Sequence, residues 1–245
     1  MKPIVLIPAR MASSRLPGKP LADIGGVPMI VRVWRKAVAA GVGPVVVACA
    51  EKEVQQAVEA AGGRAVMTNA ALPSGSDRVW AALNAVDRAF EHDIVVNLQG
   101  DLPTFDPSCI KAALDAMVTT GGEIGTCAAE IDDPAEADNP SVVKVVATWD
   151  VGGVYGRAHY FSRSRIPSGK GPWFAHVGLY VYRREALQRF VGLQPSPLEQ
   201  REKLEQLRAS ESDIKIAVGR VDEVPLSVDT PADLEKARAL VAREK

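Results

Sequence analysis

The chain has 245 residues, of which 47% are hydrophobic and 24% are charged, and its formal net charge is −1. Such a composition is typical of an ordinary globular protein with a substantial core. A nearly neutral chain lacks the basic excess that favours nucleic acid, and it contains no apolar run of membrane-spanning length. We therefore predict neither nucleic acid nor a membrane as a partner.

The three cysteines stand apart in the sequence, without the close pairing that is typical of a metal or redox motif. Cys49, Cys109 and Cys127 are therefore expected to be buried, reduced thiols. No signal peptide is visible at the N-terminus, so we predict a cytoplasmic protein.

The first half alternates between short apolar runs and segments with an apolar stripe at helical spacing. The stripe of the third such segment is formed by Val79, Leu83, Val86 and Phe90. The patterns predict strands over 3–9, 44–49, 64–68 and 93–99, and helices over 30–38, 51–62, 76–90 and 110–118. This alternation indicates an α/β fold with a mostly parallel sheet that is covered on both faces.

From about residue 123 the alternation loosens. Strand-like runs at 123–131, 141–149 and 174–183 are joined by irregular stretches, which predicts a smaller mixed or antiparallel part. Two later helices have strong start signals in "SPLE" and "TPAD", each with a hydroxyl cap, a proline and an acid. No linker forces a division, so we predict one domain over 1–245.

The loop after the first predicted strand, 9–26, contains three cations. Because ligands of open parallel sheets bind beyond the carboxyl ends of the strands, Arg10, Arg15 and Lys19 are placed to bind an anion, and a polyphosphate suits them. The loop is not a Walker A motif, because no Ser or Thr follows the lysine. A solvated basic loop explains the residues equally well on spacing alone.

Two aspartates are candidate ligands for Mg²⁺, which prefers oxygen donors and phosphate partners. Asp101 follows the strand 93–99, and Asp229 precedes the helix cap in "TPAD". Each alone is explained by a turn or a cap. Together with a polyphosphate loop, the pair suggests a metal-phosphate enzyme, and we predict that the two side chains converge beside residues 9–19.

Three further positions admit a functional and a plain structural interpretation. "LPSGSDRV" opens a helix near Ser74 and Arg78, where an anion or a base edge is favoured, but capping by Ser74 or Ser76 is the more common explanation. His176 lies in an apolar run, where a satisfied core histidine is the more frequent case. Tyr180 is expected to pack against its neighbours.

A set of motifs resembles the 3-deoxy-manno-octulosonate (KDO) cytidylyltransferases, in the same order and over nearly the whole chain. The motifs are "IPARMASSRLPGKPL", "LPSGSDR", "VNLQGD", "SVVKVV", "YFSRSRIP", "HVGLYVY", "QPSPLEQREKLEQLR" and "VDTPADLEKAR". The resemblance implies a Rossmann-like nucleotidyltransferase fold and a homodimer. It also implies that CTP and KDO react to give CMP-KDO and pyrophosphate, with Mg²⁺ as cofactor.

The resemblance also implies roles for individual residues. Residues 1–122 would mainly bind nucleotide, and 123–245 would mainly bind sugar and form the dimer. CTP would contact Pro8, Ala9, Arg10, Arg15, Lys19, Ser74, Arg78 and Asp101. The catalytic set would be Arg15, Lys19, Asp101 and Asp229, with the two aspartates on Mg²⁺. The sugar acid would face Gln99, Arg163, His176, Tyr180, Glu205 and Gln206.

Two departures from the family pattern concern the substrate side. Leu102 stands where the family usually has Glu, and the stretch 166–175 is short. A related acid sugar, such as amino-KDO or a sialic acid, therefore stays open as the acceptor. A non-catalytic sensor of CTP is the alternative from another class, although a pure binder has no need of two paired carboxylates.

Overall fold

The computed structural model describes residues 1–243, and its contacts divide the chain into two compact units. The first unit is Met1–Ser108 together with the C-terminal segment from Pro225. The second is Cys109–Val224. The C-terminal segment, which includes Asp229, thus packs with the first half of the chain.

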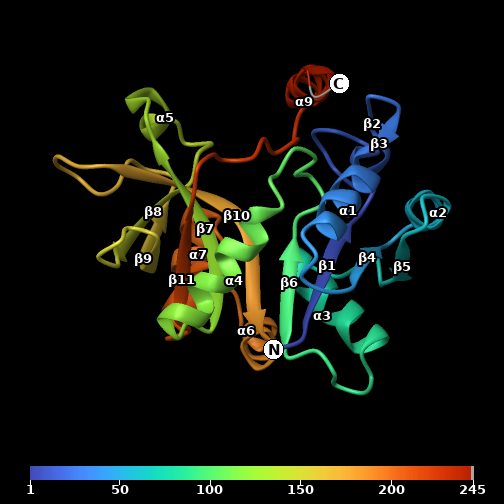
Figure 1. The fold of residues 1–245 in the computed structure, drawn as a ribbon, viewed down its shortest axis with the longest axis horizontal. Helices are drawn as coiled ribbons and strands as arrows, with labels where there is room; N and C mark the ends of the chain where they lie inside the picture. The colour runs from blue at the N-terminus through green and yellow to red at the C-terminus, as the bar shows by residue number, and fades with distance from the viewer. Residues whose placement is uncertain (244–245) are drawn as a thin grey trace. The chain divides into compact units, whose positions relative to one another are not determined.

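The first unit contains strands in the order β5 (Arg64–Met67), β4 (Val45–Cys49), β1 (Pro3–Ala9) and β6 (Ile94–Leu98). Each neighbouring pair in this series is parallel. Every residue of β6 is buried, as are most residues of β1. Burial of consecutive residues requires cover on both faces, as the apolar runs predict. The four strands lie side by side in Figure 1, and α1 (Met29–Ala39) packs against β1 and β4.

The connections in this unit also follow the predicted order. After β1 come a short 3-10 turn, Lys19–Leu21, and a small hairpin of β2 (Asp23–Ile24) and β3 (Val27–Pro28). The remaining helices are α2 (Lys52–Ala60), α3 (Gly75–Val86) and α9 (Pro231–Arg243). α9 packs on β2, which ties the C-terminal segment to the hairpin.

The predicted helix 76–90 is too long. α3 ends at Val86, and Phe90 lies beyond it with a positive φ of 55° and a side chain that is 72% exposed. Asp87 ends the helix because its carboxylate accepts hydrogen bonds from the amides of Glu91 and His92, at 2.9 and 3.1 Å. Carboxylates that bond to nearby amides compete with helical hydrogen bonding, and the apolar spacing gives no sign of it.

The second unit contains strands in the order β10 (Trp173–Arg183), β7 (Ile124–Ile131), β11 (Ile216–Val221), β9 (Tyr155–Ser162) and β8 (Lys144–Trp149). β8 also pairs with β10, so the series returns to its first strand. Only β7 and β11 are parallel among these pairs. The architecture is therefore mixed α/β, and the mostly parallel arrangement describes the strands of the first unit alone.

The helices of the second unit complete the fold. They are α4 (Ser108–Thr120), α5 (Pro134–Asp138), α6 (Arg184–Gly192), α7 (Pro197–Glu202) and α8 (Leu207–Glu211). α4 begins at the boundary between the units, and α7 starts with the predicted capping box, in which the amide of Ser196 donates to Glu199 at 3.0 Å. The three cysteines are free and buried, as predicted. Within residues 1–243, no helix is both long and apolar enough to cross a membrane.

Candidate nucleotide and metal site

A pocket of about 350 Å³ opens in the first unit at the carboxyl ends of β1 and β6. Ligands of open α/β sheets bind at this edge. All eight residues that the resemblance assigns to CTP line it, together with Gln99 and Asp229. The other lining residues are Ala12, Ser13, Ser14, Pro20, Met29, Leu72, Gly75 and Gly100.

The cationic loop is held in a closed turn by backbone contacts. Gly18 has a φ of +71°, a conformation that a side chain disfavours, and its amide donates to the carbonyl of Met11 at 3.3 Å. The amide of Met11 donates in turn to the carboxylate of Glu51, at 3.0 Å. The loop therefore arches back on itself and presents Lys19, the residue after Gly18, to the pocket.

Lys19 lies between the two aspartates. Its ammonium nitrogen is 2.7 Å from Asp101 Oδ2 and 3.0 Å from Asp229 Oδ1. Arg15 approaches the other oxygen of Asp229 at 3.2 Å, at a more exposed position. The predicted convergence of Asp101 and Asp229 beside the loop is confirmed, and the lysine is the group that joins them.

Backbone geometry brings Asp101 to this place. A Cβ on Gly100 would lie 2.9 Å from the carbonyl oxygen of Pro8, so the end of β6 approaches β1 closely only because residue 100 is glycine. The carbonyl of Asp101 then accepts a hydrogen bond from the amide of Val228 at 2.9 Å. This bond places Asp229, the next residue, beside Asp101.

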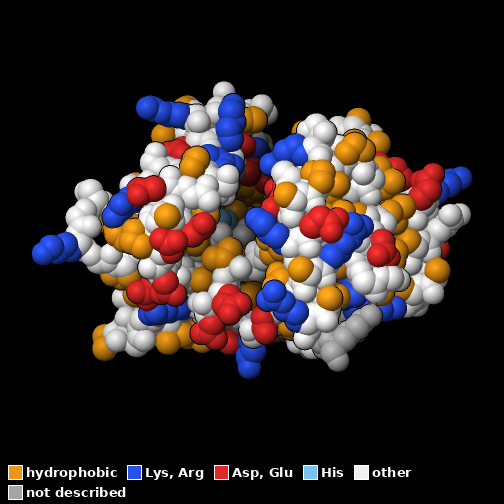
Figure 2. Space-filling view, turned by 90° about the horizontal axis from the view of Figure 1, so that it is seen from above, with side chains coloured by type: hydrophobic (Ala, Val, Ile, Leu, Met, Phe, Trp, Pro, Cys, Tyr) orange, Lys and Arg blue, Asp and Glu red, His pale blue; other side chains and the backbone are white. Residues whose placement is uncertain are grey.

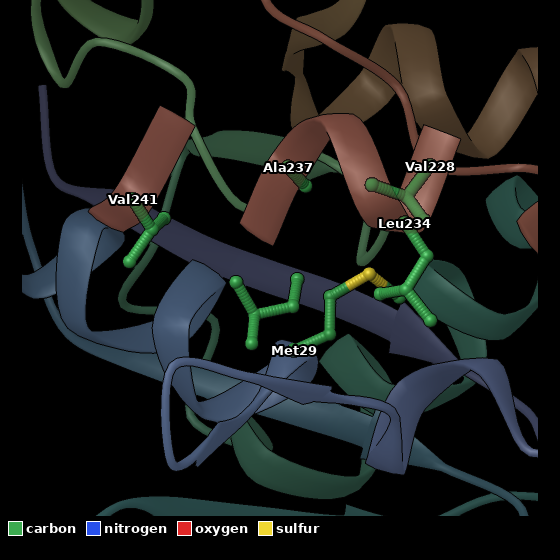
Figure 3. Close-up of a cluster of buried hydrophobic side chains, with 6 residues drawn as sticks. Met29, Val228, Leu234, Ala237 and Val241 are labelled. Carbon is green, nitrogen blue, oxygen red and sulfur yellow. The ribbon is translucent and has the colours of Figure 1, made fainter. Parts of the chain in front are cut away.

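A hydrophobic cluster holds the Val228 segment in position. Met29, at the start of α1, packs with Val228 and with Leu234, Ala237 and Val241 of α9 (Figure 3), and Ile24 completes the cluster. The Thr230 hydroxyl accepts from the amide of Asp233, whose carboxylate accepts from the amide of Thr230, at 3.2 and 3.0 Å. This reciprocal cap starts α9 directly after Asp229, as "TPAD" predicts.

The start of α3 also lines the pocket. The Ser74 hydroxyl oxygen accepts from the amide of Asp77 at 3.1 Å, so the capping interpretation is confirmed, and Ser74 also lines the pocket. The guanidinium of Arg78 is buried and donates to the Thr68 hydroxyl and to the carbonyl of Asn69, at 2.5 and 3.2 Å.

The electrostatics of the pocket favour an anion. Burial lowers the pKa of Arg78, and the nearby positive charge of Arg10 lowers it further. Burial acts in the same direction on Lys19, but the charges and hydrogen bonds of Asp101 and Asp229 outweigh it, so the pKa of Lys19 is raised. Both groups stay protonated at neutral pH. On the face seen in Figure 2, by contrast, Lys and Arg side chains are interspersed with Asp and Glu, consistent with the net charge of −1.

The two aspartates fit a hard cation. Two carboxylate oxygens already face one positive charge, and Mg²⁺ takes such oxygens together with phosphate oxygens and water. Within residues 1–243, no group of three or more His, Cys, Asp or Glu forms a metal site. A metal at Asp101 and Asp229 would therefore complete its ligand set from bound nucleotide and solvent.

The residues predicted to face the sugar lie in both units. Gln99 lines the pocket of the first unit, where its amide donates to Asn97 Oδ1 at 3.1 Å. Arg163, His176, Tyr180, Glu205 and Gln206 belong to the second unit.

His176 and Tyr180 form part of a row of aromatic side chains on β10. The His176 ring lies 5.0 Å from that of Phe161 and 5.5 Å from that of Tyr180, centroid to centroid. Its Nε2 is 2.9 Å from the Thr126 hydroxyl. Burial lowers the pKa of His176 to about 3 and raises that of Tyr180, so both are neutral at pH 7. They therefore place two neutral polar side chains among aromatic neighbours.

Arg163, Glu205 and Gln206 come from connecting segments of the second unit. Arg163 follows β9, and its guanidinium donates to two backbone carbonyls, those of Pro140 and Glu202, each at 3.1 Å. Glu205 lies 3.8 Å from Arg208, and Gln206 is 6% exposed before α8.

The two departures from the family pattern have different structural settings. Leu102 is 5% exposed and belongs to the hydrophobic core, so an apolar residue suits the position. In the short stretch 166–175, Trp173 donates from its indole nitrogen to the carbonyl of Pro167 at 3.1 Å, and the Arg165 guanidinium lies 3.9 Å from the Trp173 ring centroid.

The sequence motifs did not indicate two residues that hold the site in place. Glu51 binds the amide of Met11 in the cationic loop, and Thr68 accepts from Arg78. Both follow parallel strands at the same edge of the sheet, Glu51 after β4 and Thr68 after β5. Asp101 was predicted because it follows a strand at the carboxyl edge, where ligands of parallel sheets bind. The same reasoning applies to Glu51 and Thr68, so their positions after strands could have identified them.

Comparison with known proteins places this fold and site in a family. Residues 4–216 match the model of the cytidylyltransferases. The chain is 61% identical to 3-deoxy-manno-octulosonate cytidylyltransferase of Parvibaculum lavamentivorans, over 98% of this chain and 93% of that protein. It is 59% identical to the protein of the same name from Methylobacterium radiotolerans, over 98% and 96%.

The solved structures agree. CMP:2-keto-3-deoxy-manno-octonic acid synthetase in complex with CTP has a TM-score of 0.91 and 44% identity, with both chains fully covered. A 4-diphosphocytidyl-2C-methyl-D-erythritol synthase from Anaerococcus prevotii, 11% identical with a TM-score of 0.64, shares the fold, over 99% of each chain. The fold is that of the nucleotidyltransferases. The chain belongs to the family of the 3-deoxy-manno-octulosonate cytidylyltransferases.

Proposed function

We propose that the protein transfers CMP from CTP to the anomeric hydroxyl of KDO, which gives CMP-KDO and pyrophosphate and activates KDO for lipopolysaccharide synthesis. The observation that carries the proposal is the pocket in which Lys19 joins Asp101 and Asp229 beside the cationic loop. Family membership, with 61% identity to one relative over nearly the whole chain, supports the choice of both substrates.

The nucleotide is bound and its charge offset by the residues of the pocket. Arg10, Arg15 and Lys19 would contact the triphosphate, whose negative charge grows on the pyrophosphate as it leaves. Ser74 and Arg78, with the backbone of Pro8 and Ala9, would meet the cytidine. Fixed donors at these positions reduce the reorganisation that the reaction requires.

The pair Asp101 and Asp229 would hold Mg²⁺. A bound Mg²⁺ supplies a positive charge that stabilises phosphate oxygens and lowers the pKa of a nearby hydroxyl. Because Lys19 contacts both carboxylates, it would give up at least part of these contacts and turn toward the triphosphate.

The acid sugar would be bound by Gln99, Arg163, His176, Tyr180, Glu205 and Gln206. The carboxylate of KDO calls for a cation, and Arg163 is the cation in this set. The neutral ring of His176 would orient a sugar hydroxyl, since its low pKa makes it a poor proton acceptor. Gln206→Ala is expected to raise the KM for KDO about tenfold or more and to leave the KM for CTP nearly unchanged, because the buried contact of a polar side chain is worth on the order of 2 kcal/mol.

Cytoplasmic location and a homodimer are part of the same proposal. Size-exclusion chromatography with light scattering tests the dimer, and fractionation of cells that express the protein tests its location.

The deciding experiment is pyrophosphate release on mixing CTP, Mg²⁺ and KDO, with amino-KDO and a sialic acid as parallel acceptors. We expect release that needs both Mg²⁺ and KDO. Faster turnover of another acid sugar would reassign the acceptor. Binding of CTP without release for any acceptor would indicate the sensor alternative.

A further inference from the structure

Lys144 in the second unit is a lysine whose side chain is fully buried. Its residue is 0% exposed at the start of β8. The ammonium donates to three backbone carbonyls, those of Asn139, Val142 and Arg163, at 3.0, 2.7 and 2.6 Å. All three donors of the ammonium are therefore used, and they join two separate segments, 139–142 and the residue after β9.

Both of these segments determine where the Arg163 guanidinium lies. The backbone of Arg163 is bonded to Lys144 directly through its carbonyl. One of its guanidinium nitrogens donates to the carbonyl of Pro140, which lies within the segment that Lys144 closes. Lys144 thus holds the backbone of Arg163 and also the segment that contains Pro140, whose carbonyl is one of the two acceptors of the Arg163 guanidinium.

Glu202 supports the other side of Arg163. Its carboxylate accepts from the amide of Arg163 and from the hydroxyl of Ser162, at 3.1 and 2.8 Å, and its own carbonyl accepts from Arg163 Nε. The guanidinium itself rests on carbonyls, which carry no net charge. Its positive charge therefore remains suited to an anionic ligand.

The backbone around Lys144 also contacts a second residue of the proposed sugar site, His176. Lys144 pairs with Ala175 of β10, and the carbonyl of Val143 accepts from the amide of His176 at 2.7 Å. Arg163 and His176 are thus both attached to the backbone around Lys144.

We propose that Lys144 is a positioning residue for the acid sugar: by binding the carbonyls of Asn139, Val142 and Arg163, it holds the Arg163 guanidinium ready for the sugar carboxylate. This inference rests on the proposed function, in which Arg163 faces the acid sugar. A purely structural role of Lys144 would lower stability without distinguishing between the two substrates.

The test compares Michaelis constants for KDO and CTP in wild type and in Lys144→Met, which keeps an unbranched side chain one atom shorter and removes its donors. We expect the KM for KDO to rise about tenfold, as loss of a well-aligned contact to a charged group would cause, and that for CTP to change by less than about twofold. In the Arg163→Ala background, Lys144→Met should raise the KM for KDO by no more than about twofold, because the group that it positions is gone.

Val145→Ala is the matched control, since Val145 is the next residue of β8 and equally buried but uses no side-chain hydrogen bond. It should lower the melting temperature and leave the ratio of the two KM values unchanged. If Lys144→Met does not fold, as judged by circular dichroism, Lys144→Gln decides the question, because its amide retains two donors and a milder selective rise is then expected.

Equal rises for both substrates, an unchanged ratio, or the same rise with and without Arg163 would overturn the inference. Wild-type turnover of KDO is measured first and tests the proposed function separately. If the wild type prefers another acid sugar, the same comparison is made with that sugar.

Discussion

The contact of Lys19 with both aspartates can be tested without turnover, by removing the ammonium in Lys19→Met. Two oxygens bonded to one nitrogen at 2.7 and 3.0 Å lie within about 6 Å of each other, and two unit charges at that distance repel by about 3 kcal/mol at an effective dielectric constant of about 20. The side chain of Asp229 is 37% exposed, so water screens part of this repulsion, and we expect a net cost of about 1–2 kcal/mol.

The assay is thermal unfolding at pH 7.5 with and without Mg²⁺. Without the ion, the Tm of Lys19→Met should fall by about 2–8 °C relative to wild type. Mg²⁺ should stabilise the variant more than the wild type, because it takes the place of the missing charge between Asp101 and Asp229 without a competing ammonium.

The control is Lys111→Met, which removes an exposed lysine on α4. It should change neither the Tm nor the response to Mg²⁺. Equal stabilisation of wild type and Lys19→Met by Mg²⁺, or a Lys19→Met variant as stable as the control, would refute the placement of a cation site between the two aspartates.

Three further outcomes are expected. Asp101→Asn should nearly abolish pyrophosphate release at saturating Mg²⁺ with unchanged circular dichroism, since an amide does not replace the charge that anchors the ion; activity near that of wild type would remove Asp101 from the mechanism. His176 has its pKa lowered to about 3, so it is neutral in the folded state and protonated in the unfolded state between pH 6.5 and about 3. Protonation of His176 on unfolding should therefore lower the free energy of unfolding by about 1.4 kcal/mol per pH unit as the pH falls through this range. In urea unfolding at pH 4, 5 and 7, the free energy of unfolding of His176→Gln should depend less steeply on pH than that of wild type. Leu234→Ala should cost about 2–4 kcal/mol of unfolding free energy because it opens a cavity under α9, whereas Leu240→Ala, at a 41% exposed position of the same helix, should cost less than about 0.5 kcal/mol; equal losses would show that the cluster does not anchor the helix.

The sequence by itself determined the local elements and one edge of the site. The positions of apolar residues predicted the alternating strands and helices of the first unit. Buried strands appear as short apolar runs, and helices show an apolar stripe that recurs every three or four residues. Since parallel strands end at a common edge, the order of elements also placed Lys19 and Asp101 near each other. The capping motifs at the starts of α7 and α9 could be recognised in the sequence because they join residues only a few positions apart.

Only the tertiary structure decided the contacts between distant segments. Lys19 and Asp229 are 210 positions apart, and they meet because Val228 is bonded to Asp101 and buried under α9. β9 and β11 were not predicted from the sequence. Polar residues interrupt the apolar run of β9, and a glycine interrupts that of β11, so pairing with neighbouring strands defines both. No feature of the sequence marks Lys144 as a buried lysine. Its burial follows from hydrogen bonds to three backbone carbonyls that the folded chain brings together, and no periodic pattern records where such carbonyls will point.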